Sequence, residues 1–288
     1  MAPSIACRTG PRLERWCGRH NGRVTPEWAR YWRARQQPVE AMHAHFTEHV
    51  YHRHSHETYS FGVTDDGAQT FRCRGGKHTS ATGMIMAFNP DDPHDGHSAT
   101  ELGFTYRMVH IGPELVPGMP LFAEPVVDDP VLAAALRALH GALLGNAPAL
   151  RRDELLDATV AAIVRRASTR PAVLPVEGLR GGAMIAERVR RRIHEGFLDD
   201  LTAEDLARAA GGSRFAVYRA FQARYGMAPS DYQRQLRLRE ARRRIAAGRP
   251  IGQVAGETGF ADQSHLTRWF GRYFGITPRA YQEAGKRS

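Results

Sequence analysis

Three histidines in the N-terminal half have a spacing that could bind a metal ion or a polar ligand. His54 and His56 are separated by one residue, and His94 lies further along the chain. Alternate side chains of a β-strand point to the same face, so both rings of the pair would face one cavity. A third imidazole there would complete a facial metal set. A pocket for a small polar molecule is the second interpretation, and surface or hydrogen-bonded structural histidines are the third.

A second set of chemically suited residues lies near the C-terminus, where one pattern occurs twice. Residues 206–221 and 254–270 each predict a short helix, a glycine turn and a longer helix, as in a helix-turn-helix. One face of each longer helix is apolar, and the other carries side chains that can hydrogen-bond base edges in the major groove. An ordinary solvated face is the alternative, but the same chemistry in both copies favours DNA. The expected DNA-binding residues are Arg214, Phe215, Tyr218, Arg219, Gln263, Ser264, Thr267 and Arg268.

Residues 187–281 resemble the paired helix-turn-helix domain of the AraC/XylS family of bacterial transcription regulators. Tyr218 departs from the family pattern, in which a smaller polar residue is common at this position. The resemblance implies a protein that binds double-stranded DNA and contacts RNA polymerase. It rests on the Gly259-Phe260 turn, the run Leu266-Thr267-Arg268-x-Phe270 and the tail Tyr273-Phe274-Gly275-x-Thr277-Pro278-x-x-Tyr281.

Charge and cysteine content agree with a DNA-binding protein in a reducing compartment. Residues 184–288 carry 20 basic and 11 acidic residues, against 20 and 19 in residues 1–183. The C-terminal half is therefore the part that favours a polyanion. Cys7, Cys17 and Cys73 include no pair at metal-ligand spacing, as expected in a reducing cytoplasm. No apolar run approaches the length of a membrane helix, so we expect no membrane partner.

Local signals predict where the C-terminal helices begin. Thr202 and Asp205 have the spacing of a capping box. Ser213 and Asp262 can cap the longer helix of each copy. A further helix over residues 230–247 is expected to join the two copies.

The N-terminal half predicts a small β-barrel. Glycine, proline and aspartate turns separate short runs in which apolar residues recur with a period of two. Residues 27–35 predict a short helix, with Trp28, Tyr31 and Trp32 on one face. The fold class is therefore α+β. The expected strands cover 42–46, 59–63, 70–74, 84–88 and 104–109.

The order His54-x-His56, Gly83, Pro90 and His94 resembles a cupin, the barrel that AraC-type regulators use as a sensor. The resemblance implies a small-molecule effector inside the barrel. Metal-binding cupins carry an acidic ligand four or five residues after the histidine pair, where this chain has Ser60 and Phe61. We therefore expect no cofactor, with a metal on the three histidines as the alternative. Histidines that accept hydrogen bonds from the effector would lose this role on protonation near pH ~6.5. The expected effector-binding residues are His54, His56, Arg72, His94 and Tyr106.

Two amphipathic helices are expected after the barrel, over residues 129–144 and 151–166. Leu136 and Leu139 belong to the apolar stripe of the first helix. Such helices can cover the barrel or meet the same helices of a second chain, and the family resemblance favours a homodimer. On that prediction, Leu136→Asp gives a folded monomer.

The predicted organisation has five segments. They are a disordered tail (1–26), a sensor barrel (27–125), a helical dimerisation segment (126–168), a linker (169–183) and a paired helix-turn-helix domain (184–288). The predicted function is a cytoplasmic, ligand-responsive transcription regulator that is not an enzyme. The alternatives are a metal-dependent cupin enzyme fused to a DNA-binding domain, and a nucleoid-type binder without a sensor.

Overall fold

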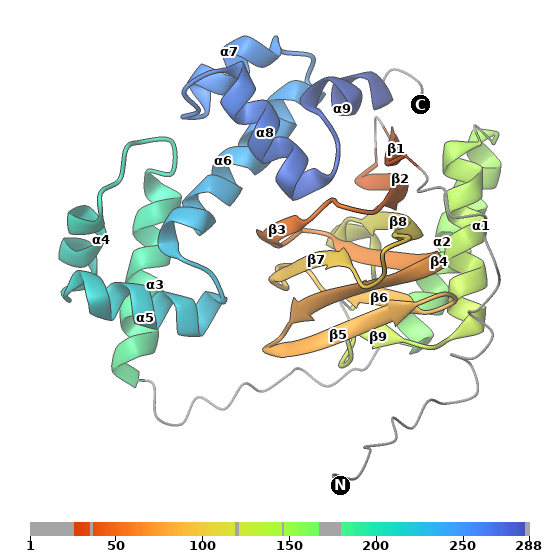
Figure 1. Cartoon of the computed structure of the whole chain (residues 1–288), viewed down its shortest axis with the longest axis horizontal. Coiled ribbons are helices and arrows are strands. Elements are labelled where there is room, and N and C mark those ends of the chain that lie inside the picture. Colours follow the sequence, from red (N-terminus) through yellow and green to blue (C-terminus); the bar gives the residue numbers. More distant parts are fainter. Residues whose placement is uncertain (1–25, 35–36, 119–120, 146, 167–179, 286–288) are drawn as a thin grey trace, which may run out of the picture.

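The computed structural model describes residues 26–34, 37–118, 121–145, 147–166 and 180–285. The predicted tail over 1–26, apart from its last residue, and most of the predicted linker over 169–183 lie outside these residues. An antiparallel sheet forms the N-terminal half, and helices form the C-terminal half (Figure 1). The predicted α+β class is confirmed.

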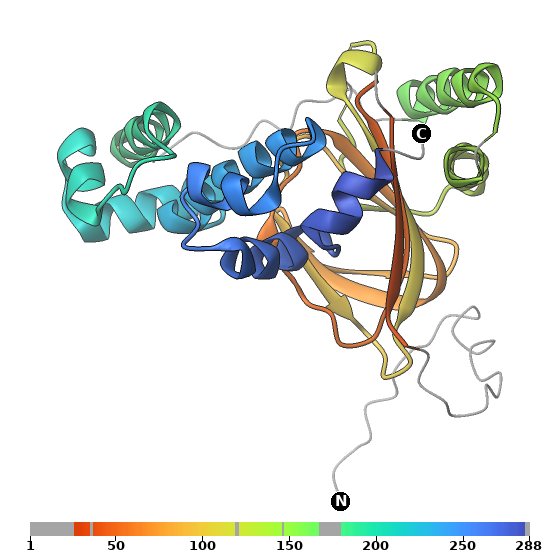
Figure 2. The same ribbon diagram turned by 90° about the horizontal axis from the view of Figure 1, so that it is seen from above.

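Nine strands of the described residues pair into one curled antiparallel sheet. The first part of strand β4 pairs with β6 and β8, and its second part pairs with β5 and β7. A register shift between Thr64 and Asp66 separates the two parts, and such a bulge bends a strand. The sheet therefore folds over itself (Figure 2). Apolar side chains such as Met42, Met86 and Met108 fill its inner face, and a second core lies between its outer face and helices that follow it. The strands are β1 (Trp28–Arg33), β2 (Val39–Phe46), β3 (Tyr51–His54), β4 (Tyr59–Cys73), β5 (Gly76–Ala81), β6 (Ile85–Phe88), β7 (His94–Ser98), β8 (Phe104–Ile111) and β9 (Val126–Val127).

Strand β1 contradicts the helix predicted over residues 27–35. It pairs with β2 from Trp28 opposite His45 to Arg33 opposite Glu40. The aromatic residues of this segment have helical spacing, but aromatic side chains also favour strands. A strand places Tyr31 and Trp32 on opposite faces, where each packs against a different hydrophobic core. Burial of both rings is the tertiary effect that overrides the local pattern.

Helices α1 (Pro130–Leu144) and α2 (Ala149–Arg166) follow the last strand and cover one side of the barrel (Figure 1). Asp129 caps α1, because its side chain accepts hydrogen bonds from the backbone N–H groups of Val131 and Leu132. The stripe that includes Leu136 and Leu139 is fully buried against the barrel core of the same chain. The prediction that Leu136→Asp leaves a folded monomer is therefore wrong, because this side chain already has its partners within one chain.

Seven helices of the described residues form the C-terminal half. Thr202 and Asp205 form the predicted capping box, and Ser213 and Asp262 cap the longer helices as predicted. None of the helices in the described residues is long and apolar enough to cross a lipid bilayer. The helices are α3 (Arg180–Glu195), α4 (Ala203–Ala210), α5 (Arg214–Tyr225), α6 (Pro229–Ala246), α7 (Ile251–Glu257), α8 (Gln263–Phe274) and α9 (Pro278–Ala284), and a 3-10 turn over Pro113–Leu115 lies in the N-terminal half.

The two helix-turn-helix units differ in how they are attached. The first unit, α4 and α5, packs with α3 and α6 around a separate core that includes Val217 and Phe221. The second unit, α7 and α8, shares a core with the barrel, in which Phe270 and Tyr273 join barrel residues such as Phe46. Figure 1 shows the second unit beside β1 to β3, while the first stands away from the barrel at the other end of α6. The second unit is therefore the one that can respond directly to a change in the barrel.

Leu136→Asp should destabilise the barrel rather than separate two chains. The Leu136 side chain is 1% exposed, so the substitution buries a carboxylate without a partner. We expect the free energy of unfolding to fall by more than about 4 kcal/mol, measured by urea denaturation of the full-length chain. Val131→Asp, on the same helix at a position that is 58% exposed, is the matched control. Its effect should stay within about 0.5 kcal/mol. A Leu136→Asp protein of wild-type stability would contradict the observed packing.

Candidate effector site and nucleic-acid interface

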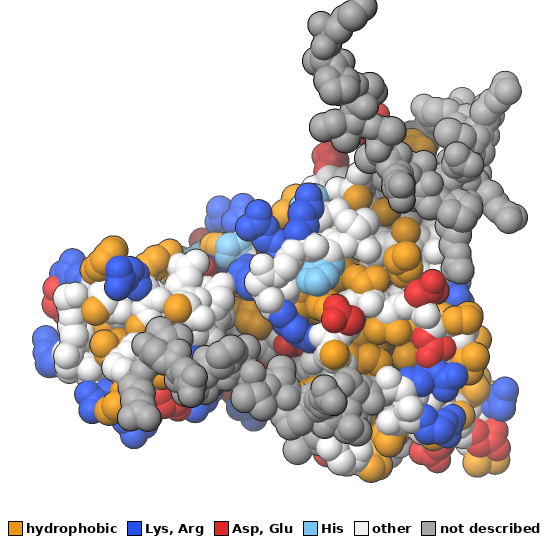
Figure 3. Space-filling model, turned by 90° about the horizontal axis from the view of Figure 1, so that it is seen from below, with side chains coloured by type: hydrophobic (Ala, Val, Ile, Leu, Met, Phe, Trp, Pro, Cys, Tyr) orange, Lys and Arg blue, Asp and Glu red, His pale blue; other side chains and the backbone are white. Residues whose placement is uncertain are grey.

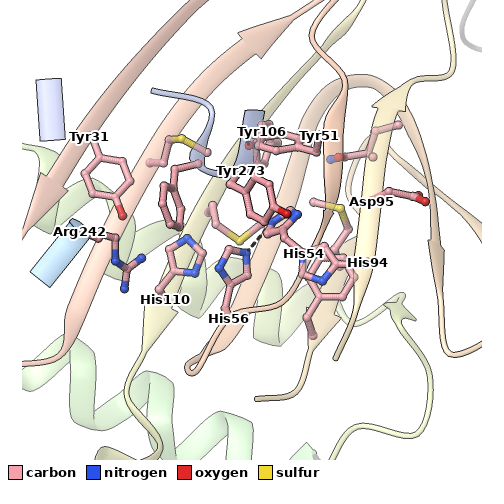
Figure 4. Close-up of a pocket in the computed structure, with 17 residues that line it drawn as sticks. Tyr31, Tyr51, His54, His56, His94, Asp95, Tyr106, His110, Arg242 and Tyr273 are labelled. Carbon is pink, nitrogen blue, oxygen red and sulfur yellow. Dashed lines mark hydrogen bonds between the residues drawn. The ribbon is translucent and has the colours of Figure 1, made fainter. Parts of the chain in front are cut away.

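A cavity of about 40 Å³ lies between the barrel and the C-terminal helices (Figure 4). Helices α6 and α8 contribute Arg242, Tyr273 and Phe274 to its wall. The volume has room for about two or three water molecules. It is far below the roughly 300 Å³ of the smaller ligand pockets in proteins. The barrel residues that line it are Tyr31, Met42, Tyr51, His54, His56, Gln69, Met86, Phe88, His94, Asp95, Gly96, Tyr106, Met108 and His110.

The structure brings the three predicted histidines together. His54 ends β3 and lies opposite His94, which begins β7. The ring centroid of His54 lies 4.7 Å from that of His56 and 4.5 Å from that of His94. The Nε2 atoms of His54 and His56 are 3.2 Å apart (Figure 4, dashed line). Their proximity was predicted from the sequence, and a role in effector binding stays a prediction.

Burial keeps these rings neutral. Burial, together with neighbouring histidines, lowers the pKa of His54 and of His56 well below the usual value. Burial lowers the pKa of His94 and of His110 to about 4. The prediction that the pocket histidines protonate near pH ~6.5 is therefore wrong, because a charged ring would lose its hydration inside the barrel.

Of the two other residues predicted to line the pocket, Tyr106 does so and Arg72 does not. Tyr106 lines the cavity, and its hydroxyl is 2.7 Å from the hydroxyl of Tyr51. Arg72 is exposed and does not line the cavity, so its predicted place there is wrong. Its neighbours Phe71 and Cys73 are buried, and strand alternation turns Arg72 to the outside. Strand alternation alone does not say which face of a predicted strand is internal, so the sequence could not place Arg72 outside.

Sequence reasoning missed several polar residues of the cavity, among them His110 and Arg242. His110 is on β8 at the same strand parity as Tyr106, and this periodicity could have indicated it. Its Nδ1 atom is 2.8 Å from the hydroxyl of Ser60, and its ring centroid is 4.8 Å from that of His56. Arg242 comes from α6, in a part of the chain expected to bind DNA, and no local signal could have placed it in the barrel.

Arg242 belongs to a buried polar group that joins the two halves, which we call the clasp: Glu40, Arg242, Tyr31 and Tyr281. A guanidinium nitrogen of Arg242 lies 3.4 Å from the Glu40 carboxylate. The Tyr281 hydroxyl donates to the same carboxylate at 2.8 Å, and the Tyr31 hydroxyl also donates to it. Burial alone would raise the pKa of Glu40, but the Arg242 charge and these hydroxyl donors outweigh it and lower the pKa below its ordinary value. Glu40 is therefore ionised at neutral pH and holds α6 and α9 on the barrel.

A second link connects α6 to the histidine pair itself. Ser55, between His54 and His56, donates its backbone N–H to the side-chain oxygen of Gln235 at 2.9 Å. The Gln235 amide nitrogen donates back to the Ser55 hydroxyl, also at 2.9 Å. Arg239, one turn further along α6, donates to the same hydroxyl at 3.1 Å. The segment that carries two pocket histidines is therefore fixed to the helix that joins the two DNA-reading units.

The predicted DNA-reading side chains are accessible. Most of them are exposed on the outer faces of α5 and α8, and Thr267 is half-buried. The Phe215 side chain is 67% exposed and that of Tyr218 is 50% exposed, which leaves two large apolar groups on the outer face of α5. On the face shown in Figure 3, basic side chains lie around the helical part and along its border with the barrel. Contact of these residues with bases stays a prediction.

The four predicted DNA-reading side chains of α5 are not equally free to reach DNA. Arg214 forms an ion pair with Glu204 of α4. The Arg219 guanidinium lies 4.9 Å from the ring centroid of Phe215, a cation–π arrangement that keeps both side chains on the outer face. Arg268 on α8 is exposed. Arg219 and Arg268 are therefore the better candidates for base contacts.

Comparisons with known proteins agree with this arrangement. An AraC-like ligand binding domain matches residues 36–160, and a helix-turn-helix domain matches residues 206–284. The chain belongs to the AraC family of transcription regulators. In this AraC-family chain, most residues that line the cavity lie in the matched ligand-binding domain, and helices α5 and α8 lie in the matched helix-turn-helix domain.

Relatives of this AraC-family regulator include two curated proteins. The HTH-type transcriptional regulator YbfI of Bacillus subtilis (strain 168) is 26% identical over 224 residues, which cover 74% of this chain and 80% of YbfI. The transcriptional activator NphR of Rhodococcus sp is 36% identical over 98 residues, or 33% of this chain and 29% of NphR. Among solved structures, unsaturated fatty acid-bound ToxT of Vibrio cholerae strain SCE256 has a TM-score of 0.50 at 9% identity, and the match covers 92% of this chain and 97% of ToxT. The ToxT match shows a common fold.

Glu40→Gln tests the clasp. The substitution leaves the Arg242 charge buried without its counterion, so we expect a loss of about 3 kcal/mol in the free energy of unfolding at pH 7. Because the pKa of Glu40 is lower in the folded protein, its contribution is present above the unfolded value of about 4.3 and is lost as the pH falls through the folded value. Urea unfolding of both proteins between pH 3 and pH 7 should show their difference shrink in acid. Glu283→Gln, which breaks an exposed pair with Arg279, should cost less than about 1 kcal/mol; an equal loss in both variants would reject the clasp.

Arg219→Ala and Arg268→Ala test the recognition helices. Each should weaken binding to a DNA site selected from a random library by about 1–3 kcal/mol if the side chain reaches a base edge. Binding to random DNA should change less, because phosphate contacts do not depend on sequence. The measurement is fluorescence anisotropy of the full-length protein. Arg151→Ala, which removes one exposed charge from α2, is the control. An equal loss of affinity for selected and for random DNA would show that both arginines contact only phosphates.

Proposed function

We propose that this regulator binds a small-molecule effector in the cavity between the barrel and helices α6 and α8, and that binding changes the position of the second helix-turn-helix unit. The observation that carries the proposal is the composition of the cavity wall. It combines barrel residues, among them His56 and Tyr106, with Arg242 and Tyr273 of the DNA-binding half. A molecule bound there would contact both halves at once.

The size of the cavity indicates which arrangement of the barrel and the C-terminal helices an effector would favour. At about 40 Å³ it cannot hold a molecule of ordinary effector size while α6 and α8 stay in place. An effector would therefore bind an arrangement in which α6 and α8 have shifted far enough from the barrel to enlarge the cavity, while Arg242 and Tyr273 still form part of its wall. A ligand that favours one arrangement shifts the equilibrium toward it by its difference in affinity for the two. The effector and the closed contact between the halves are then mutually exclusive.

The chemistry of the wall indicates the class of effector. Met42, Met86 and Met108 supply apolar surface, and the histidines and tyrosines supply hydrogen-bonding groups. An effector with an apolar body and a few polar groups fits this wall. The proposed effector-binding residues are His54, His56, His94 and Tyr106, as predicted, with His110 and Arg242 added.

The DNA reader is proposed to span two turns of the major groove. Helix α6 has 18 residues and is ~27 Å long at ~1.5 Å per residue. Successive major-groove sites on one side of DNA are ~34 Å apart. A rigid helix of that length between the units can hold α5 and α8 at adjacent grooves. A change in the barrel that moves α8 would alter this spacing.

The remaining parts of the proposal concern assembly and cellular context. We propose a cytoplasmic homodimer that contacts RNA polymerase and consists of the sensor, the dimerisation helices, the linker and the DNA reader. Two of the predicted bounds move, because β9 (Val126–Val127) pairs with β6 of the barrel and α3 begins at Arg180, within the predicted linker over 169–183. Leu150 and Val164 of α2 are exposed apolar side chains on one of the helices that cover the barrel, and they support contact with a second chain there. We propose a regulator without enzymatic activity, because the two domains that the chain matches are a ligand-binding domain and a helix-turn-helix domain.

Gln235→Ala tests the link between the cavity and the DNA reader. It removes two hydrogen bonds between α6 and Ser55, so the open arrangement becomes more populated. The apparent affinity of an effector rises with the population of the binding-competent state. We expect binding to tighten about tenfold, measured by calorimetry with a compound found by thermal-shift screening of the full-length protein.

Gln233→Ala is the matched control on the same helix. Its amide donates only to Phe197 and Asp199, within the C-terminal half. Effector affinity should stay within about twofold of wild type. An unchanged affinity in Gln235→Ala would show that effector binding is independent of the contact between the halves.

A further inference from the structure

The His54, His56 and His94 rings are arranged around one point. One ligand nitrogen from each ring lies within 4.8 Å of those from the other two. Tetrahedral coordination at Zn–N distances of about 2.0–2.1 Å places neighbouring ligand nitrogens about 3.3 Å apart. The observed separation of the His54 and His56 Nε2 atoms is 3.2 Å. The pair therefore already has the spacing of two ligands of one ion.

Hydrogen bonds behind two of the rings direct their lone pairs to this point. His54 Nδ1 lies 2.6 Å from the carbonyl oxygen of His52, and His94 Nδ1 lies 2.8 Å from that of Asp92. A carbonyl oxygen only accepts, so each Nδ1 carries the proton and each Nε2 carries a lone pair. In the ion-free protein the lone pair of His54 accepts a hydrogen bond from His56 Nε2, and binding of an ion would replace that hydrogen bond. A backbone carbonyl behind a metal-binding imidazole has this same role in metalloproteins.

Packing holds the rings in place. The His94 ring is stacked on Phe88, with centroids 3.7 Å apart and planes 4° apart. His54 and His94 are paired across β3 and β7, so the strands themselves fix their separation. Strand positions are more precise supports for a ligand set than loops.

We propose that His54, His56 and His94 bind one divalent first-row transition-metal ion per chain. Three imidazoles without a carboxylate or thiolate suit Zn²⁺, Ni²⁺ or Cu²⁺ rather than Mg²⁺ or Ca²⁺. The missing acidic residue at positions 60 and 61 does not prevent this, because three histidines and one water complete a tetrahedral shell. The adjoining cavity of about 40 Å³ has space for that water. The proposal does not depend on an organic effector.

The proposed metal site lies next to helices α6 and α8 of the DNA-binding half. The ring of Tyr273, on α8, lies 5.8 Å from that of His54. Ser55, between two of the ligands, is bonded to Gln235 on α6. An ion that fixes the segment 54–56 therefore fixes the surface on which the second helix-turn-helix unit rests.

The test is metal titration of the tag-free, full-length protein after treatment with a chelator. Calorimetry with ZnCl₂ should show one saturable site per chain. His56→Gln and His94→Gln should each weaken Zn²⁺ binding at least 100-fold, since loss of even an outer-shell partner costs about 10–100-fold. His97→Gln, at an exposed position on the same strand as His94, should bind as wild type does. Co²⁺ in place of Zn²⁺ should give the intense visible absorption of a four-coordinate ion in wild type and in His97→Gln only.

Two results would overturn the proposal. One is the absence of saturable Zn²⁺ binding by the wild-type protein at micromolar concentrations. The other is wild-type affinity in both His56→Gln and His94→Gln. His56 is the least buried of the three, so its variant should stay folded, and circular dichroism of the metal-free proteins checks this. A protein that responds to an organic effector but binds no Zn²⁺ would refute the metal site alone.

Discussion

The arrangement of this regulator depends on one buried contact, in which Glu40 of the barrel meets Arg242 of the helix that joins the two DNA-reading units. Removing two charges from water is costly, and only close geometry with further hydrogen bonds offsets that cost. The Tyr31 and Tyr281 hydroxyls supply those bonds. An ion pair of this kind is favourable only at one relative position of its two side chains. It therefore fixes the orientation of the barrel and the C-terminal helices more than it adds to the free energy of unfolding. Around it, Phe270 and Tyr273 complete a hydrophobic core that belongs to both halves.

This contact divides the DNA reader into two parts with different freedom. The first unit has its own core and meets the barrel mainly near α6, where Arg53 donates to the Gly226 carbonyl at 2.6 Å. The second unit is built into the barrel wall. In the proposed mechanism α5 and α8 read DNA at a fixed spacing, and a change in the barrel wall would reach the DNA through α8 and α6 without any separate signalling element. The outer face of α8 is exposed even though its inner face lies on the barrel.

The histidine segment lies where these effects meet. His54 and His56 face the cavity, and Ser55 between them faces α6. Successive side chains at the end of β3 therefore contact the interior of the barrel and helix α6 in turn. The two are connected through neighbouring residues of one segment. The small cavity follows from the same packing, because Arg242, Tyr273 and Phe274 occupy space that an isolated barrel would leave open.

The sequence by itself determined the parts that depend on local interactions. Helix starts at Thr202, Ser213 and Asp262 follow from side-chain caps within a few residues, and the apolar and polar faces of α5 and α8 follow from helical periodicity. The proximity of His54, His56 and His94 followed from strand alternation and from the cupin resemblance. The tertiary structure decided which face of each strand or helix is buried, because periodicity alone does not determine this. Trp28–Arg33 formed a strand because β2 offered an edge. Arg72 lies on the outer face of the sheet, and the apolar stripe with Leu136 packs on the barrel. Arg242 entered the cavity from a helix more than a hundred residues away in the chain, and only long-range packing could place it there.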